Sequence, residues 1–225
     1  MVNGPRWILQ DLLRNHFKGL VLRSPLCYNA QFGIRFDLQT CSNADEEYFR
    51  AGLSRAQAIF WKVFAPEDNA IVFVQEYKYK PRQRLKKNSF VFKKLKTTKA
   101  QYGKVKNLYE ENQIHNSFVG QIDLGKSDII NVLREIQDRD FYYRRKTRNR
   151  SGSTFAVEVY FINVERRIIF YMYDDRGVDV IASKMEDLVE LYRELNDWIL
   201  DYDRKEIDEK VRTTGSKSNG VTAHQ

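Results

Sequence analysis

The sequence lacks the features that membrane spans, secretion signals and disulfide frameworks require. Its longest unbroken apolar run is Ile168 to Tyr173, whereas an α-helix needs about 20 apolar residues to cross a bilayer. The N-terminus has no basic segment followed by an apolar one, which a signal peptide would show. Cys27 and Cys41 are too few for a disulfide framework or a structural zinc site of their own. We therefore expect a cytoplasmic protein without membrane contact.

Motifs of catalysis and cofactor binding are also scarce. The three histidines, His16, His115 and His224, are scattered along the chain and none belongs to a His–Glu or His–Asp motif. The 11 glycines form neither a phosphate-binding loop nor a dinucleotide fingerprint. The sequence therefore predicts no catalytic residues, no metal and no cofactor, and it favours a non-enzymatic protein.

What the chain does have is enough apolar material, 42% of its 225 residues, to form one core. Helical spacing of apolar residues predicts helices at 5–17, 43–64 and 127–137, the last capped by Ser127, and a long helix from about residue 183. Runs of β-branched and aromatic residues predict strands at 32–38, 70–79, 155–164, 168–173 and 178–182. The last three strands are joined by tight turns, which indicates an antiparallel meander. The predicted fold class is α+β: an antiparallel sheet with a C-terminal three-stranded meander, packed by N-terminal helices and a long C-terminal helix. We expect one domain over 1–212 and a disordered tail over 213–225.

Positive charge is concentrated rather than uniform. The chain has 38 Lys and Arg against 30 Asp and Glu, a net charge of +8, and the segment 78–109 carries no acid before Glu110. We expect this lysine-rich segment to be exposed, with a short strand at Phe90–Phe92. Two interpretations stay open: a surface that binds nucleic acid phosphates, or a solvated edge that lysines keep soluble. The candidate nucleic-acid-binding residues are Lys78, Lys80, Arg82, Arg84, Lys86, Lys87, Lys93, Lys94, Arg144, Arg145, Lys146 and Arg148.

Acids dominate the C-terminal part, which makes the molecule bipolar. From Glu165 to Lys210 there are 14 acids and 8 bases, a pattern that suits a protein partner with a patchy surface. The segment 174–177 reads as a tight turn in which Gly177 supplies a positive φ and the carboxylates cap free N–H groups. The alternative interpretation is a pair of carboxylates that holds a divalent cation. The candidate acidic binding surface consists of Asp174, Asp175, Arg176, Asp179, Asp201, Asp203 and Arg204.

Several of these segments carry a family resemblance. Residues 159–163, 169–182 and 198–204 resemble the C-terminal signature of a bacterial family of unknown function, the one numbered 3885, which is common in Bacillus relatives. Residues 28–29 and 33–37 are similar to its N-terminal segment. The resemblance implies kinship rather than an activity. Because some members occur in polymorphic-toxin settings, it also implies an immunity or accessory protein.

The first functional hypothesis is therefore a non-enzymatic protein-interaction protein whose partner is another protein, such as a toxin domain. The net charge of +8 argues against an acidic nuclease inhibitor that mimics nucleic acid. A nucleic-acid-binding protein is the first alternative. A metal-dependent phosphodiesterase or nuclease around Asp174 and Asp175 is the second.

Overall fold

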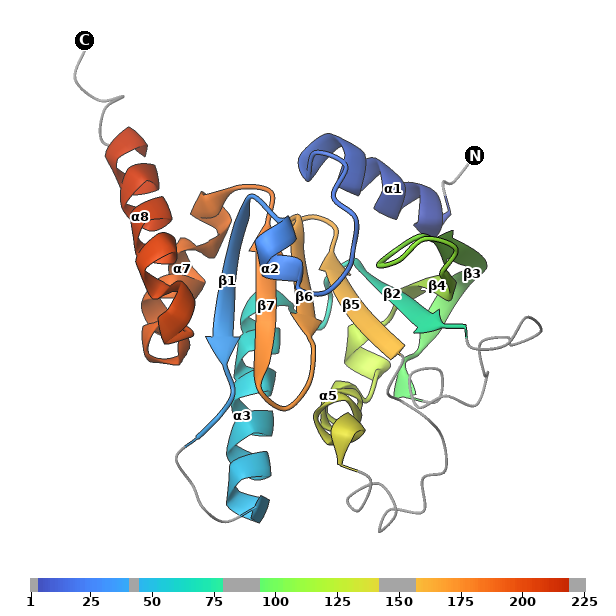
Figure 1. Cartoon of the computed structure of the whole chain (residues 1–225), viewed down its shortest axis with the longest axis horizontal. Coiled ribbons are helices and arrows are strands. Elements are labelled where there is room, and N and C mark those ends of the chain that lie inside the picture. Colours follow the sequence, from blue (N-terminus) through green and yellow to red (C-terminus); the bar gives the residue numbers. More distant parts are fainter. Residues whose placement is uncertain (1–3, 41–44, 79–93, 142–156, 219–225) are drawn as a thin grey trace.

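The protein is built around one antiparallel sheet. The computed structural model describes residues 4–40, 45–78, 94–141 and 157–218, and their seven strands pair in the order β1-β7-β6-β5-β2-β4-β3 (Figure 1). The strands are β1 (Phe32–Asp37), β2 (Ala70–Tyr77), β3 (Thr97–Lys106), β4 (Ile114–Ile122), β5 (Val157–Asn163), β6 (Ile168–Met172) and β7 (Gly177–Ala182). The strands β5, β6 and β7 form the meander that the sequence predicts.

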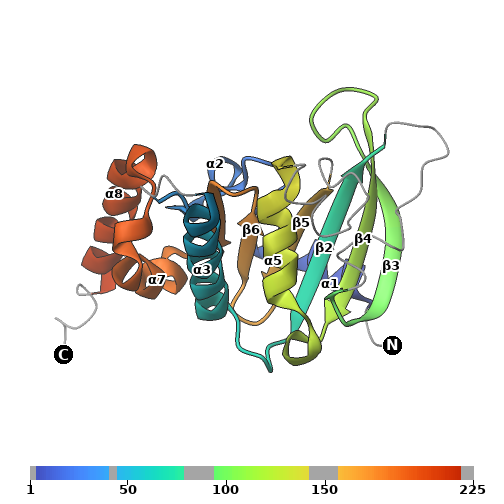
Figure 2. The same ribbon diagram turned by 90° about the horizontal axis from the view of Figure 1, so that it is seen from below.

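Helices cover both faces of the sheet. They are α1 (Pro5–His16), α2 (Leu26–Asn29), α3 (Asp45–Val63), α5 (Ile129–Gln137), α7 (Val189–Glu194) and α8 (Asp201–Ser218), with 3₁₀ segments η1 (Leu124–Lys126), η2 (Asp138–Asp140), η3 (Met185–Leu188) and η4 (Asn196–Trp198). Figures 1 and 2 show α3 and α5 on one face, α1 and α2 on the other, and α7 and α8 beside β1. This arrangement confirms the α+β class.

Alternation along the strands explains why both faces are covered. In β2, Val72 and Val74 belong to the core under α3 and α5, whereas Ile71 and Phe73 belong to the core under α1 and α2. Successive side chains of a strand point to opposite faces, so an unbroken apolar strand needs a helix on each side. Phe60 of α3, fully buried, anchors the first core.

The segment between β2 and α5 differs from expectation. Residues 97–106 form the edge strand β3, whose side chains are mostly exposed, and residues 114–122 form the buried strand β4. The predicted lysine-rich exposed segment therefore ends in an ordered strand, and the sequence analysis missed β4 completely. The strand predicted at 90–92 lies outside the described residues.

The C-terminal helix also begins later than predicted. Instead of one helix from residue 183, the chain forms η3, α7 and η4 before α8 begins at Asp201. The break lies at Ile199, which forms a β-bridge with Phe36, and at Leu200, whose N–H donates to Arg35 O at 2.9 Å. The prediction of one continuous helix was wrong because pairing with the edge of β1 overrides local helical spacing.

Smaller differences concern helix ends and membrane contact. The cap of α5 is Asp128, whose carboxylate accepts from Asn131 N, rather than Ser127. The helix α8 continues to Ser218, into the segment expected to be a disordered tail. Among the residues described, no helix is both long and apolar enough to cross a bilayer.

Candidate functional site

The β6–β7 turn holds the first three candidate residues. Asp174, 1% exposed, accepts from Arg176 N at 2.8 Å and from Arg176 Nε at 2.9 Å. Asp175 is also buried and accepts from Tyr48 Oη of α3 at 2.7 Å. Burial raises the pKa of the Asp175 carboxyl above its ordinary value, with a further contribution from the Asp174 charge. The carboxylate of Asp174 thus caps a turn N–H group, as the turn interpretation predicts.

Gly177 serves this turn for a reason other than the predicted one. Its φ is not positive. A Cβ at this position would lie 2.0 Å from Tyr173 Oη and 2.8 Å from Phe36 O, which is closer than real Cβ atoms approach. Glycine is needed here because other groups lie against its Cα, and the positive φ that we expected was wrong.

Asp179 forms a buried ion pair across strands β1 and β7. Arg35 faces Asp179 in the register, and its Nε and Nη2 donate to the two carboxylate oxygens at 2.7 and 2.9 Å. Asp179 is fully buried and also accepts from Cys27 N at 2.9 Å. The rings of Tyr28 and Tyr173 lie 4.4 and 5.4 Å from the Arg35 guanidinium. Every oxygen of this carboxylate therefore has a donor within the protein.

The same environment controls the protonation of the Cys27 thiol. Burial, followed by the neighbouring Asp179 charge, raises the pKa of its thiol to about 12. The thiolate is the reactive form of cysteine, so this side chain stays protonated near neutral pH. Cys27 is suited to packing rather than to nucleophilic attack.

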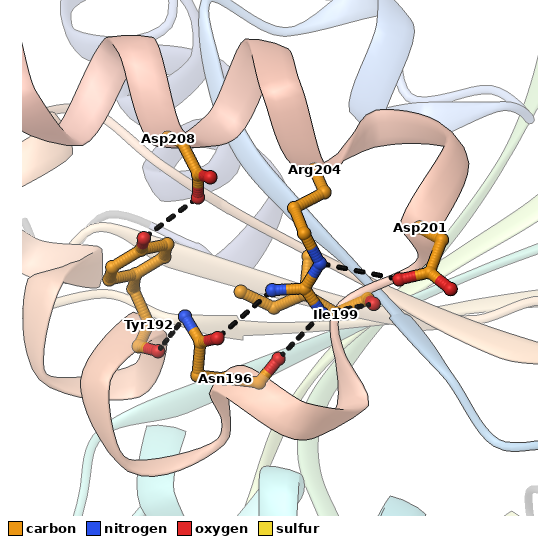
Figure 3. A network of polar contacts seen from close by, with 6 residues as sticks. All are labelled: Tyr192, Asn196, Ile199, Asp201, Arg204 and Asp208. Atoms are coloured by element: carbon orange, nitrogen blue, oxygen red, sulfur yellow. Dashed lines mark hydrogen bonds and ion pairs between the residues drawn. The ribbon is translucent and has the colours of Figure 1, made fainter.

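The remaining candidates, Asp201, Asp203 and Arg204, connect α8 to the rest of the protein, and Figure 3 shows Asp201 and Arg204. Arg204 donates from Nη1 to Asn196 Oδ1 at 2.9 Å and from Nη2 to Asn196 O and Ile199 O at 3.0 and 3.1 Å. It also approaches Asp201, whose side chain is 96% exposed, at 3.3 Å. Asp203 is buried and accepts from Tyr28 Oη at 2.9 Å. Arg204 therefore holds the carbonyl groups of the η4 turn, where the chain changes direction.

The seven acidic-surface candidates do not form one exposed surface. Asp174, Asp175 and Arg176 lie in the β6–β7 turn. Tyr28 contacts both the Arg35–Asp179 pair and Asp203. Asp201 and Arg204 lie in the first turn of α8. Among the residues described, no three His, Cys, Asp or Glu side chains are grouped so that they could hold a metal ion. The hydrogen bonds and ion pairs of these residues mainly hold β1, the β6–β7 turn and α8 in place.

The basic candidates lie largely beyond the described residues. Of the twelve, only Lys78 and Lys94 are described; Lys80, Arg82, Arg84, Lys86, Lys87, Lys93, Arg144, Arg145, Lys146 and Arg148 lie outside. Lys94 Nζ pairs with Asp128 Oδ2 at 2.8 Å, and this contact lowers the pKa of Asp128. Lys94 is therefore partly neutralised.

Exposed basic side chains do gather along the last strand of the sheet. We call Lys96, Lys99, Tyr102, Lys104 and Lys106 the β3 edge; all five are exposed. Alternation places Tyr102, Lys104 and Lys106 on one face of β3, and Tyr102 packs edge-on against Phe118 with ring centroids 5.3 Å apart. Within the described part of the chain, β3 pairs only with β4, so its outer side has no strand partner.

A polar row on the α1 face is the feature that sequence reasoning missed. Gln75 of β2 faces Ser117 of β4 and Glu158 of β5. The Glu158 carboxylate accepts from Gln75 Nε2 at 2.5 Å, from Tyr160 Oη at 3.1 Å and from Tyr109 Oη. The alternation of polar residues at 75, 77, 115, 117 and 158 within apolar strands was the available signal.

Most polar groups of this row form hydrogen bonds with one another. Burial, followed by nearby Tyr171 and Glu158, raises the pKa of Tyr160 well above its ordinary value, so its hydroxyl stays protonated and donates to the carboxylate. Two buried atoms, Gln75 Oε1 and His115 Nδ1, have no hydrogen-bond partner within the described part of the protein. The row fits a structural network that fixes β2, β4 and β5 in register.

Comparison with known proteins identifies the family of the chain. The family described as "Domain of unknown function (DUF3885)" matches residues 9–203, which include the seven described strands and six of the seven acidic-surface candidates, all but Arg204. The chain is also similar to "Uncharacterized protein YnaE" of Bacillus subtilis (strain 168), with 24% identity over 176 residues that cover 74% of this chain and 82% of that protein. No solved structure matches the chain. The chain therefore belongs to the DUF3885 family.

Proposed function

We propose that this protein is a non-enzymatic interaction protein that binds an acidic partner protein along the β3 edge. The observation that carries the proposal is the exposure of four lysines and one tyrosine on or directly before the terminal strand β3, whose outer side pairs with no described strand. The acidic candidates support it indirectly. Because Asp174, Asp175, Asp179 and Asp203 are buried, these four acids have little charge to offer a partner, whereas the lysines of the β3 edge are exposed.

The geometry of an edge strand favours a protein partner. A strand at a sheet edge presents N–H and C=O groups that an extended peptide can pair with. Lysines on such an edge also oppose pairing with a second copy of the same strand, because like charges would face each other. An acidic extended segment meets both conditions, since it supplies backbone partners and neutralises the lysines.

The family context gives this partner a biological setting. The resemblance to family 3885 implies an immunity or accessory role beside a polymorphic toxin, and a toxin domain with an acidic extended segment would be a partner of the proposed chemistry. Co-expression with any toxin gene that neighbours its own gene in the host genome addresses this directly. Neutralisation of the toxin supports the role, and unchanged toxicity with both proteins expressed contradicts it.

The interaction itself is testable with a synthetic probe. We expect an extended peptide of alternating Glu and Val to bind the wild-type protein, and binding to weaken by at least about tenfold in the Lys104→Glu/Lys106→Glu variant, because two attractive contacts become repulsive. A matched control is Lys184→Glu/Lys205→Glu, which changes the same net charge at exposed positions away from β3. Fluorescence anisotropy of the labelled peptide gives the dissociation constants.

A second peptide separates strand addition from simple charge attraction. N-methylation of alternate peptide bonds removes backbone donors but keeps the charge, so it should abolish binding if the peptide pairs with β3. Equal binding of the methylated peptide, or equal loss in both charge variants, would contradict the proposed docking mode.

One topological observation favours nucleic acid as a second candidate. Glu76 near the end of β2 faces Val157 at the start of β5, and in the chain these two points adjoin the basic runs at 80–93 and 144–150. The described residues 76–78 and 157, each of which flanks one run on one side, therefore lie at one end of neighbouring strands. If about six phosphates were neutralised on duplex DNA, the log–log dependence of affinity on salt would have a slope near −5. Anisotropy with short DNA and RNA at two salt concentrations measures it.

A further inference from the structure

A cavity of about 330 Å³ lies where the end of α1 and the end of α2 meet the sheet. Phe32 opens β1 and faces Ala182 at the end of β7, and both residues line the cavity together with segments that follow α1 and α2. Figure 1 shows the start of β1 and the end of β7 at the same edge of the sheet, on the side where α1 ends. The cavity lies at the β1 side of the sheet and is distinct from the β3 edge at the other side.

Its size and lining are those of a small-molecule site. Ligand pockets commonly have volumes of about 300–1,000 Å³, with apolar walls and a few polar groups that fix orientation. Here Phe17 and Phe32 provide apolar wall, while His16, Lys18 and Gln31 provide polar groups. The lining includes no Asp or Glu, so the formal charge among its residues is positive.

Ser183 adds an observation that points to a missing partner. Ser183 lines the cavity, and its Oγ is buried and forms no hydrogen bond with any residue that the structure describes. A buried hydroxyl without a partner destabilises the folded state. The backbone N–H of Ser183 donates to Arg167 O at 3.2 Å, so the hydroxyl is the donor of this residue that has no described partner.

One effect opposes an anion at this place. The C-terminal end of α1 carries a partial negative charge, which disfavours a bound anion. Two features reduce it. Leu13 O of the last turn already accepts from Phe17 N and Gly19 N, and Lys18 places a full positive charge beside the same turn. A full charge outweighs a partial one at comparable distance.

We infer that this cavity binds a small organic anion, a phosphate or carboxylate attached to an apolar group. The anionic group would lie toward Lys18, His16 and the Ser183 hydroxyl, and the apolar group would contact Phe17 and Phe32. A ligand with about ten non-hydrogen atoms matches the volume. The site involves none of the residues of the β3 edge, so its occupancy and partner binding are measured independently.

Isothermal titration calorimetry on the full chain tests the inference with phenyl phosphate. We expect a dissociation constant of about 1 mM or tighter, which is modest for a ligand of this size. Benzyl alcohol, which keeps the ring without the charge, should bind at least about tenfold more weakly. Inorganic phosphate, which keeps the charge without the ring, should also bind more weakly. Equal affinity for benzyl alcohol and phenyl phosphate would overturn the inference.

Variants locate the site. Lys18→Glu should weaken phenyl phosphate binding by about tenfold or more, and Ser183→Ala by about two- to tenfold, the value of one neutral hydrogen bond. Lys184→Glu is the matched control, because it reverses a neighbouring exposed charge outside the lining and should leave the affinity unchanged. Equal affinity of the wild-type and Lys18→Glu proteins would overturn the inference.

Amide chemical shifts of the wild-type protein give a test that needs no variant. Phenyl phosphate should shift the amides of residues 16–20, 29–32 and 182–183, which line or adjoin the cavity, and leave those of β3 unchanged. Shifts confined to β3 would show that the anion binds the lysine-rich edge instead, and they would contradict the inferred site.

Discussion

The two edges of the sheet differ in whether their charged residues are buried or exposed. At the β1 edge, carboxylates are buried and paired with arginines: Asp179 with the buried Arg35 inside the sheet, and Asp174 with the exposed Arg176 in the adjoining turn. The C-terminal segment closes this edge through the Phe36–Ile199 bridge. At the β3 edge, lysines are exposed and no described strand lies outside them.

The contrast shows that sequence clusters of charge do not by themselves mark a binding surface. A buried charge is tolerated only when its hydrogen bonds are satisfied inside the protein, so it has little left to offer a partner. An exposed lysine adds little to stability and remains available for binding. We therefore expect substitutions at the β1 edge to change stability, and substitutions at the β3 edge to change binding.

The largest effect should come from breaking the Arg35–Asp179 pair. Asp179→Ala leaves the Arg35 guanidinium in a buried site without its carboxylate, and we expect a loss of about 3–5 kcal/mol in the free energy of unfolding. Urea denaturation measures it. The double variant Arg35→Met/Asp179→Leu removes both charges and should cost clearly less than Asp179→Ala, because no unpaired charge remains. Equal losses would mean that packing rather than charge pairing dominates.

The next effect should come from Gly177. Its Cβ would lie 2.0 Å from Tyr173 Oη and 2.8 Å from Phe36 O, so Gly177→Ala should cost about 1–3 kcal/mol through overpacking. Gly125→Ala is the control, since the nearest atom to its Cβ would lie at 3.7 Å. Adding Tyr173→Phe to Gly177→Ala removes the nearest atom and should restore part of the stability. No recovery would place the strain at the Tyr173 ring, whose Cζ would still lie at 2.6 Å, or at the Phe36 carbonyl.

The meander could be predicted because its signals are local. Strands β5, β6 and β7 are short apolar runs with polar turns between them, and each pairs with its neighbour in the chain. The strand β3 gave no such signal, because most of its side chains are exposed and an edge strand needs no apolar face. The start of α8 depends on pairing between Ile199 and Phe36, which no local pattern reveals.

The candidate site was predictable in composition but not in placement. The acids of the 174–179 segment were found by their spacing, and the turn at Asp174 was predicted correctly. Whether a carboxylate is exposed depends on partners far away in the chain. Asp179 pairs with Arg35, 144 residues earlier, and Asp175 accepts from Tyr48, 127 residues earlier. The polar row around Glu158 was missed because it spans β2, β4 and β5, and β4 itself was not predicted.

A smaller effect with a defined sign concerns Asp175. Burial raises the pKa of this carboxyl in the folded state, so the folded state binds a proton more readily than the unfolded state does. Stability should therefore fall as pH rises from the ordinary Asp value of 3.8 through the folded-state pKa. Asp175→Asn removes the charge and keeps an acceptor for Tyr48, so this variant should be more stable than wild type at pH 7.

Urea midpoints at pH 3.5 and pH 7 check this sign. The difference between wild type and Asp175→Asn should be present at pH 7 and should shrink at pH 3.5, where the wild-type carboxyl is largely protonated in both states. A variant less stable than wild type at pH 7 would mean that the charged hydrogen bond to Tyr48 outweighs the cost of burial.

The smallest stability effect should be at the β3 edge, where we expect a substitution to change binding but not folding. Lys104→Glu reverses an exposed charge, so we expect the free energy of unfolding to change by no more than about 0.5 kcal/mol. The same substitution should still weaken binding of the acidic peptide, because the attraction it removes exists only in the complex. Thermal melts and peptide anisotropy on one protein sample give both values. A stability loss above about 1 kcal/mol would show that Lys104 has a structural partner, and the β3 edge would then resemble the β1 edge, where charge holds the fold together.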